Sequence, residues 1–368
     1  MALIRVTAAE AIQHIKRAGL HVHIPAAVRI AIARRLPRLP LIAGPSGRLA
    51  GQGLRDPPEL PWQVALPPCG SFCSREAPVI PTPELTLAGE RRAGSSRANA
   101  GLYLRRVINL AYDDRGTGEP VVFIAGRGGA GRTWHLHQVP AFLAAGYRVV
   151  TFDNRGIGTT EHAEGFTTET MVADTAALIE NLKAAPARIV AASMGAFIAQ
   201  ELMVVRPELV SKAVLMATRG RLDRTREFFR RADTELAASD ARLPDSYDAK
   251  VRILESFSPK TLNDDAAAAD WIEMFTMWPL KPTPGLRCQI GISPQGNRLP
   301  AYQSITAPVL VIGFGDDVLT PPHLGREVAN AIPNGRYLEI SDAGHLGFLE
   351  RPQAVNRLAL QFFAGAAA

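Results

Sequence analysis

The sequence predicts an α/β fold in which helices cover both faces of a mostly parallel sheet and a helical cap is inserted late in the chain. Two observations support this prediction. Short β-branched runs alternate with segments of helical periodicity from residue 107 to residue 216, and such alternation produces a parallel sheet. Between about residues 219 and 305 the strand pattern disappears, and it then returns in two further runs. The cap is therefore expected between two strands of one sheet.

The first half of the expected sheet begins with residues 107–112, where apolar and polar side chains alternate as in an edge strand, and a turn at 114–118 follows. Beyond this turn, β-branched runs predict strands, and apolar residues at helical spacing predict the helices between them. The expected strands are 121–124, 148–152, 189–190 and 213–216; the expected helices are 138–145, 168–183 and the segment from Ser193 to about Val205.

The cap is expected to be helical and amphipathic over residues 223–278. Its place in the chain puts it over the crevice at the carboxyl ends of the strands, where ligands bind in open α/β sheets. Five aromatic residues occupy its apolar positions: Phe228, Phe229, Trp271, Phe275 and Trp278. We expect most of them to form the core of the cap and a minority to face the crevice as an apolar wall for a substrate.

The sheet resumes at residues 309–312, a short β-branched run bounded by Pro308 and by the Gly-Phe-Gly of 313–315, and continues with a strand at 336–340. We therefore divide the chain into four parts. These are an Arg- and Pro-rich extension (1–103), the first part of the core (104–218), the cap (219–304) and the second part of the core (305–368).

Ser193 lies in the pentapeptide Ala-Ala-Ser-Met-Gly, directly after the expected strand 189–190. A nucleophilic serine in a strained strand-to-helix turn leaves little room two positions before and after it, so glycine usually holds both places. Gly195 fits, whereas Ala191 adds one methyl group, and we expect the strand to shift slightly around it. The pentapeptide is equally that of a helix capped by Ser193, so its interpretation depends on the residues downstream.

Asp317 and His345 follow Ser193 in that order, each beyond an expected strand. A neutral imidazole can accept the serine proton on one nitrogen while a carboxylate holds the other. We prefer Asp317 to Asp316 because Val-Leu-Thr-Pro follows it, the spacing usual after a triad acid; Asp316 is expected to be an exposed turn residue. The order Ser, Asp, His is that of the α/β-hydrolases. We expect these three residues to be catalytic.

An oxyanion hole requires two backbone N–H donors aimed at the developing charge. Met194, the residue after the serine, is expected to supply one, and Arg127 the other, from the loop after the strand 121–124. Many hydrolases of this kind carry histidine where this chain has Ala125. The glycines of this loop also suggest a phosphate-binding loop, but no Lys-Ser/Thr follows them, which argues against that interpretation.

The extension differs from the rest of the chain in charge and in proline content. Residues 1–106 carry 15 Arg and Lys against 6 Asp and Glu, whereas the remainder carries 26 against 29, and 12 of the 28 prolines precede residue 84. An arm that binds nucleic acid or anionic lipid is possible because residues 28–35 have some amphipathic character, but the aromatic and glycine interleaving of an RNA-binding arm is missing. A targeting peptide would need an apolar core followed by a cleavage site, and neither is found. We favour a translated upstream region with the start near Val107, and we expect disorder there.

The composition points away from metals, cofactors and membranes. Three cysteines, Cys69, Cys73 and Cys288, do not complete a zinc site, and the pairs His21/His23 and His135/His137 have no Cys or carboxylate beside them in the sequence. No apolar run approaches the length of a membrane span. We expect a cytoplasmic enzyme that needs no cofactor, binds a small-molecule substrate and does not bind nucleic acid, and the sequence leaves its oligomeric state open.

Residues 107–363 resemble the non-haem bromoperoxidases of the α/β-hydrolase superfamily, the bromoperoxidase C type. The matching stretches are 108–114 (INLAYDD), 123–134 (FIAGRGGAGRTW), 165–168 (GFTT) and 342–348 (DAGHLGF). The resemblance covers about seven-tenths of the chain. It implies a serine hydrolase in which hydrogen peroxide can replace water, releasing a peracid that oxidises halide; the expected main reaction is hydrolysis of a small ester, lactone or related acyl compound.

Two alternatives remain open from the sequence. The same fold and the same three residue types also serve carbon–carbon hydrolases and lyases, including proton-abstracting synthases of the menaquinone pathway. A non-catalytic receptor that binds a small apolar molecule under the cap is the second alternative. An activity screen would separate the three.

Overall fold

The computed structural model describes residues 109–160, 165–239, 241–278 and 283–365. The extension 1–103, with Cys69, Cys73 and the His21/His23 pair, lies outside the described residues. The described part contains a seven-stranded sheet in the order β1-β3-β2-β4-β5-β6-β7, and only β1 runs antiparallel to its neighbour. The strands are β1 (Tyr112–Arg115), β2 (Pro120–Ile124), β3 (Arg148–Phe152), β4 (Ala187–Ala192), β5 (Val210–Met216), β6 (Val309–Phe314) and β7 (Gly335–Ile340).

The expected edge strand at 107–112 is misplaced: the structure describes this range from residue 109 on, and the strand β1 is Tyr112–Arg115, which includes part of the expected turn. Leu110 is buried in the core, and the Ala111 carbonyl accepts a hydrogen bond from the Asp153 N–H, so the chain enters the core before the strand begins. The charged residues of β1 misled the prediction. An edge strand tolerates them because one of its sides faces solvent.

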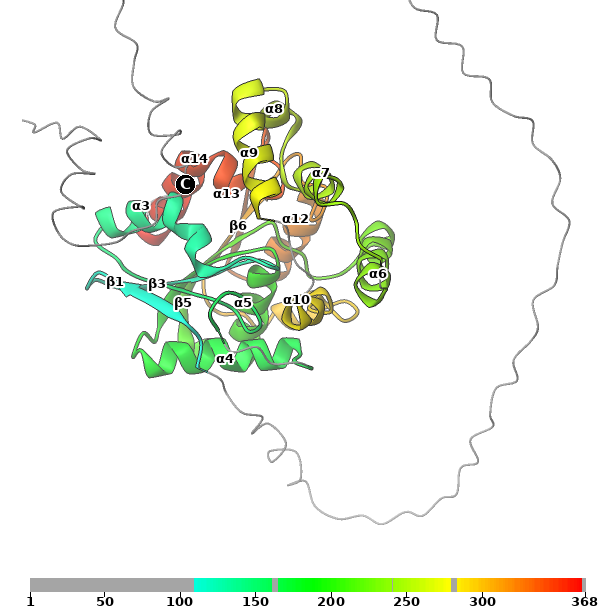
Figure 1. The fold of residues 1–368 in the computed structure, drawn as a ribbon. Coiled ribbons are helices and arrows are strands. Elements are labelled where there is room, and N and C mark those ends of the chain that lie inside the picture. Colours follow the sequence, from blue (N-terminus) through cyan, green and yellow to red (C-terminus); the bar gives the residue numbers. More distant parts are fainter. Residues whose placement is uncertain (1–108, 161–164, 240, 279–282, 366–368) are drawn as a thin grey trace, which may run out of the picture. The chain divides into compact units, whose positions relative to one another are not determined.

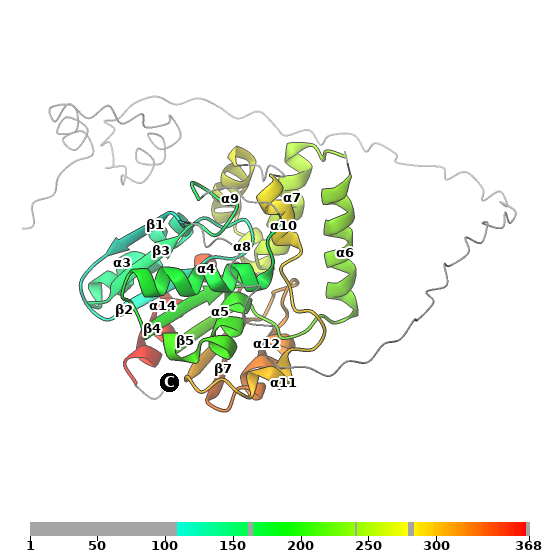
Figure 2. The same ribbon diagram turned by 90° about the horizontal axis from the view of Figure 1, so that it is seen from below.

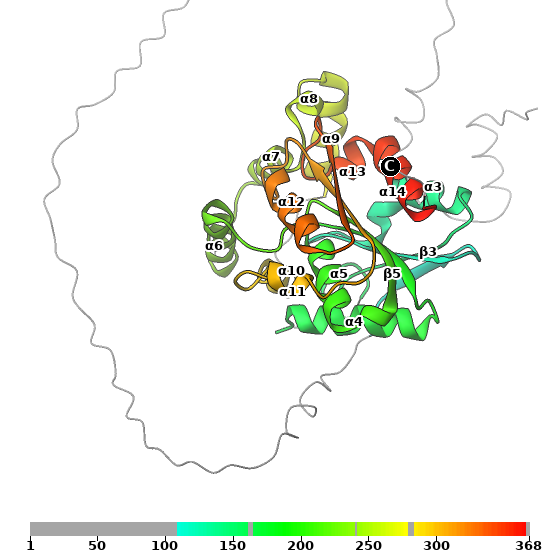
Figure 3. The ribbon, with the colours of Figure 1, turned by 180° about the vertical axis from the view of Figure 1, so that it is seen from behind.

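The alternation of side chains along the strands separates two apolar layers. Val122 and Ile124 belong to the layer that contains α4 (Thr168–Asn181), α5 (Met194–Val205) and α12 (Pro322–Ala331), whereas Val121 and Phe123 belong to the opposite layer. That layer contains the 3₁₀ helix η1 (Gly131–Leu136), α3 (Gln138–Ala144), α13 (Gly347–Glu350) and α14 (Pro352–Phe363), and the short η2 (Pro207–Leu209) precedes β5. Figures 1 and 3 show α4 and α5 on one side of the sheet and α3 and α14 on the other. The fold is the predicted three-layer α/β arrangement.

The chain between β5 and β6 is helical. Its helices are α6 (Arg224–Ala238), α7 (Asp245–Ser256), α8 (Pro259–Leu262), α9 (Asp265–Met277), α10 (Pro284–Ile290) and α11 (Leu299–Tyr302). Contacts join α7 to α9 and α6 to α10, and Figures 1 and 2 show α7 near α9 and α6 near α10. Neither α6 nor α9 contains a buried residue, so both form a thin cover rather than a second core. In the part of the chain that is described, every helix is too short or too polar to cross a bilayer.

Candidate active site

Ser193 occupies a strained turn between β4 and α5. Its backbone adopts φ 54° and ψ −121°, a conformation that residues other than glycine rarely adopt. The Ser193 N–H donates to the Met216 carbonyl of β5 (2.9 Å), which fixes the turn against the sheet. Ser193 stands at the N-cap position of α5, but its side chain makes no capping hydrogen bond. The hydroxyl is therefore available to other groups, and helix capping does not account for this serine.

Gly195 is required where α5 passes the end of β2. A Cβ atom at this position would lie 2.3 Å from the Ile124 carbonyl oxygen and 2.7 Å from that of Ala125. Ala191 is fully buried and stays in register with both neighbouring strands; the irregularity in β4 lies at Ala187 and Arg188. The additional methyl group of Ala191 thus causes no break in the pairing of the strand.

Three side chains from three loops form one hydrogen-bonded chain. His345 Nε2 lies 2.9 Å from Ser193 Oγ, and His345 Nδ1 lies 2.9 and 3.0 Å from the two carboxylate oxygens of Asp317. His345 and Asp317 are buried, whereas Ser193 is partly exposed. The neighbouring Asp316 is exposed and is not bonded to the imidazole, so the structure brings together Ser193, His345 and Asp317.

The Asp317 carboxylate is held by more groups than the sequence indicated. It accepts hydrogen bonds from the N–H groups of Leu319 and Thr320, both at 2.8 Å, and from the Thr320 hydroxyl at 2.6 Å. Burial alone would raise the pKa of Asp317, but the charge and hydrogen bond of His345 and the bonds from Thr320 outweigh it and lower the pKa. The carboxylate is thereby kept ionised beside the imidazole.

The loop between β2 and η1 lies against the serine. A Cβ atom on Gly126 would come within 3.2 Å of Ser193 Cβ, so glycine permits this approach. Within the described ranges, the backbone N–H groups of Met194 and Arg127 meet no hydrogen-bond acceptor, whereas the Gly128 N–H donates to Gln289 Oε1 at 2.9 Å. Two unpaired N–H groups near Ser193 suit an oxyanion.

Two contacts tie this loop to the cap. Gln289, on α10, is fully buried; besides accepting from Gly128, it donates to the Arg155 carbonyl at 3.1 Å. The Arg127 guanidinium pairs with Asp233 of α6 at 2.7 Å. No sequence signal pointed to Gln289, because its partners lie more than 130 positions away along the chain.

The histidine loop is also joined to the cap. The Leu346 N–H donates to the Ser256 carbonyl at 2.9 Å. The Glu350 carboxylate accepts from the N–H of Ser258 at 2.7 Å, from its hydroxyl at 2.8 Å and from the Gly344 N–H at 3.3 Å. The segment linking α7 to α8 thus holds the residues on both sides of His345.

A cavity of about 430 Å³ opens onto Ser193 and His345. Four of the five cap aromatics line it, namely Phe229, Trp271, Phe275 and Trp278. The expectation that only a minority would face the crevice is wrong, because neither α6 nor α9, which carry these aromatics, buries a side chain fully against the rest of the cap. Trp271 also packs on Phe257, with ring centroids 4.4 Å apart. The cavity has the size and the aromatic lining of a small-molecule site.

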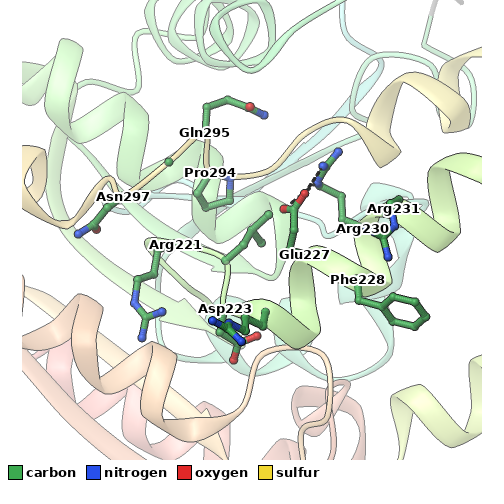
Figure 4. A pocket seen from close by; sticks show the side chains of 12 residues that line it. Arg221, Asp223, Glu227, Phe228, Arg230, Arg231, Pro294, Gln295 and Asn297 are labelled. Carbon is green, nitrogen blue, oxygen red and sulfur yellow. Dashed lines mark hydrogen bonds and ion pairs between the residues drawn. The ribbon is translucent and has the colours of Figure 1, made fainter. Parts of the chain in front are cut away.

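A second, outer groove of about 570 Å³ adjoins the cavity, and both are lined by Arg230 and Pro294. It runs between the start of α6 and residues 294–297 (Figure 4). Arg230 is joined there to Glu227, and the remaining cap aromatic, Phe228, lines this groove and is exposed.

No three His, Cys, Asp or Glu side chains of the described residues are grouped in a way that could hold a metal ion. His135 does have a carboxylate neighbour, which its sequence context had not indicated: its Nε2 lies 3.4 Å from Asp113 and 3.0 Å from the Thr151 hydroxyl. Cys288 is a partly buried free thiol.

Comparison with known proteins identifies the family. The model of the alpha/beta hydrolase family matches residues 121–358, well over half of the chain. The chain belongs to the α/β-hydrolase family. This hydrolase is 76% identical over 258 residues to the "Putative non-heme bromoperoxidase BpoC" of Mycobacterium tuberculosis, an alignment that covers 70% of this chain and 98% of the relative. It is therefore an enzyme with a highly similar relative of the non-haem bromoperoxidase type.

The crystal structure of BpoC from Mycobacterium tuberculosis superposes on this hydrolase with a TM-score of 0.70 at 74% identity, covering 72% of this chain and 99% of that one. A more distant relative, the "Putative carbamate hydrolase RutD" of Serratia proteamaculans, is 27% identical over 245 residues, which cover 65% of this chain and 89% of the relative. The similarity to BpoC confirms the resemblance found in the sequence.

Proposed function

We propose that this hydrolase cleaves a small ester, lactone or related acyl compound with Ser193 as nucleophile, His345 as general base and acid, and Asp317 as the carboxylate that orients the imidazole. The observation that carries the proposal is the unbroken chain from Ser193 Oγ through both imidazole nitrogens to the Asp317 carboxylate, with both hydrogen bonds at 2.9 Å. Ser193 and His345 line a cavity that has an aromatic wall.

The geometry supports a two-step reaction. Ser193 Oγ attacks the carbonyl carbon as its proton passes to His345 Nε2, and the N–H groups of Met194 and Arg127 stabilise the oxyanion. The tetrahedral species then collapses, and His345 returns the proton to the leaving oxygen. Water, deprotonated by His345, next attacks the acyl-enzyme, the carboxylic acid departs and the proton returns to Ser193 Oγ. Throughout, Asp317 stabilises the imidazolium without taking its proton.

Hydrogen peroxide can replace water in the second step, in keeping with the name of the BpoC relative. The product would then be a peracid, whose terminal oxygen oxidises bromide to hypobromous acid while the peracid becomes the carboxylic acid. We propose this as a side activity of the same acyl-enzyme. We also propose a cytoplasmic location, because the whole chain has only three cysteines and no pattern of a disulfide framework.

The test is covalent labelling of Ser193 with a fluorophosphonate probe, combined with turnover of 4-nitrophenyl butyrate. We expect Ser193→Ala to abolish labelling, and His345→Gln and Asp317→Asn to lower turnover by at least about 10³-fold. Two matched controls are Asp316→Asn, beside the acid, and His323→Gln, both at exposed positions. Labelling that persists in Ser193→Ala, or equal losses in the control variants, would contradict the proposal.

The same experiment tests the proposal against both alternatives, which predict little or no turnover of this ester. A lyase or carbon–carbon hydrolase would need all three residues while barely hydrolysing 4-nitrophenyl butyrate. A receptor would bind ligands without turnover, and His345→Gln would leave its binding unchanged.

A further inference from the structure

Five arginines line the cavity above Ser193, and four of them are neutralised by a carboxylate. Arg127 pairs with Asp233 (2.7 Å), Arg226 with Asp223 (3.0 Å), Arg252 with Asp248 (2.7 Å) and Arg230 with Glu227. Each of these four arginines is therefore already paired with a carboxylate of the protein. The fifth arginine, Arg219, differs.

Among the described residues, no carboxylate lies within ion-pair distance of the Arg219 guanidinium. Within the described ranges its one side-chain hydrogen bond runs from Nη1 to the Leu319 carbonyl (3.0 Å). A guanidinium has five N–H donors, so four remain for another acceptor. The nearby Asp223 is committed to Arg226, from which it accepts a backbone and a side-chain hydrogen bond.

Arg219 lies next to the reacting groups. It follows β5, whose Met216 carbonyl holds the Ser193 N–H, and it bonds to Leu319, whose N–H donates to Asp317 Oδ1. Burial and the positive charges of Arg127 and Arg226, against the opposing charges of Asp317 and Asp223, lower the pKa of Arg219 to about 10, which leaves the group charged at neutral pH. A charge withdrawn from water in this way is costly until an anion pairs with it.

The other unpaired ionisable group of the cavity does not serve as its partner. Glu255, on α7, lines the cavity and forms no ion pair with Arg219. Burial raises the pKa of Glu255, and the nearby Asp233 raises it further, against the opposing charges of Arg127 and His345. Arg219 is thus the one arginine in the described cavity wall that can offer its donors to a bound molecule.

We propose that Arg219 binds a carboxylate on the substrate, so that the preferred substrates of this hydrolase are acyl compounds carrying a second, anionic end. The inference rests on the proposed function. A planar guanidinium matches a carboxylate with two parallel hydrogen bonds, and the aromatic wall of Phe229, Trp271 and Phe275 covers the hydrocarbon chain between the two ends. Arg219 is then a specificity-determining residue.

The test compares two substrates that differ only at the far end of the acyl chain, 4-nitrophenyl valerate and 4-nitrophenyl hydrogen glutarate. The measured quantity is the ratio of kcat/KM for glutarate to kcat/KM for valerate, after subtraction of uncatalysed hydrolysis. We expect Arg219→Met to lower this ratio about 10- to 100-fold, mainly through KM for the glutarate ester, as for loss of a charged hydrogen bond. Arg219→Lys keeps the positive charge but cannot form two parallel hydrogen bonds to a carboxylate, so it should give an intermediate ratio.

The matched control is Arg230→Met, which also removes a positive charge from the cavity wall but one already paired with Glu227. Its ratio should stay within about threefold of the wild type. An unchanged ratio in Arg219→Met, or the same fall in Arg230→Met, would overturn the inference. Because the readout is a ratio, a general loss of activity in a variant does not obscure it.

Ser193→Ala distinguishes failure of this inference from failure of the proposed function. If Ser193→Ala still hydrolyses both esters, the proposed function is wrong. If it abolishes both while Arg219→Met leaves the ratio unchanged, only the role of Arg219 is wrong. Binding of glutarate itself, measured by calorimetry in the Ser193→Ala background, gives a second readout: Arg219→Met should weaken it at least about tenfold, and equal binding would refute the inference.

Discussion

Gln289 offers the sharpest test of how the cap supports the chemistry. Its side chain is fully buried, accepts from the Gly128 N–H (2.9 Å) and donates to the Arg155 carbonyl (3.1 Å). Gln289→Met keeps the length of the side chain but makes neither hydrogen bond. We expect the variant to be less stable and slower, because the loop carrying Arg127 loses its link to α10.

The size of the effect follows from the two contacts. A buried N–H left without its acceptor costs about 1–3 kcal/mol, and losing the bond to the Arg155 carbonyl adds about 1 kcal/mol, so we expect a total of about 2–4 kcal/mol. For a domain of this size, that loss lowers Tm by about 5–12 °C. Since removing one oxyanion donor costs about 10²- to 10³-fold in kcat, a displaced loop should cost about tenfold or more.

The assays are thermal unfolding followed by circular dichroism and hydrolysis of 4-nitrophenyl butyrate with kcat and KM determined separately. We expect the loss in kcat and little change in KM. Gln295→Met is the matched control, because Gln295 is exposed and bonds only weakly to the Ser293 carbonyl (3.3 Å). If Gln289→Met and Gln295→Met had Tm values within about 2 °C and kcat within twofold of each other, the reasoning would be refuted.

Three further changes test other parts of the site. Gly195→Ala would place a Cβ atom 2.3 Å from the Ile124 carbonyl oxygen, so we expect a loss of about 2 kcal/mol or more in unfolding free energy; a Tm unchanged within 1 °C would contradict this. Glu350→Gln replaces one carboxylate oxygen, which accepts from Ser258, by an amide NH₂ donor. The variant should lose about 1–3 kcal/mol of unfolding free energy and have a lower kcat, whereas an unchanged urea midpoint would exclude a stabilising role for the bonds between Glu350 and Ser258. The lowered pKa of Asp317 implies stabilisation that is present above pH 3.8, the usual pKa of this group, and is lost as pH falls through its folded value. The difference in unfolding free energy between wild type and Asp317→Asn should therefore become smaller as the pH is lowered. A difference that does not change with pH would contradict the lowered pKa of Asp317.

Local patterns were sufficient for the interior of the sheet. The strand predicted at 148–152 has the same bounds as β3, and the helix predicted after Ser193 ends at Val205, as α5 does. Both segments are buried, so their apolar patterns are continuous and easy to recognise in the sequence. β1 was misplaced because an edge strand need not be apolar. The catalytic roles of Ser193, Asp317 and His345 stay predictions, although their mutual contact followed from the order of three strand ends.

Contacts between the cap and the loops around Ser193 could not be predicted. Gln289 and Gly128 are 161 positions apart, and neither residue type indicates in the sequence that they form a hydrogen bond. In the sequence, Thr320 is only one residue of the motif after Asp317. The hydrogen bond from its hydroxyl to the Asp317 carboxylate depends on the turn that this loop adopts, which the sequence pattern does not specify. The aromatic wall was misjudged since amphipathic spacing identifies an apolar face but not whether that face meets a core or a cavity.

The cap reaches three of the loops that surround Ser193. Gln289 holds the loop of Arg127, Arg226 donates to the Val318 carbonyl beside Asp317, and Ser256 holds the residue after His345. A new cap grafted onto this sheet would therefore arrive without the bonds that position the reacting groups. A change in the cap that breaks one of these three hydrogen bonds is therefore expected to alter the turnover rate together with the choice of substrate.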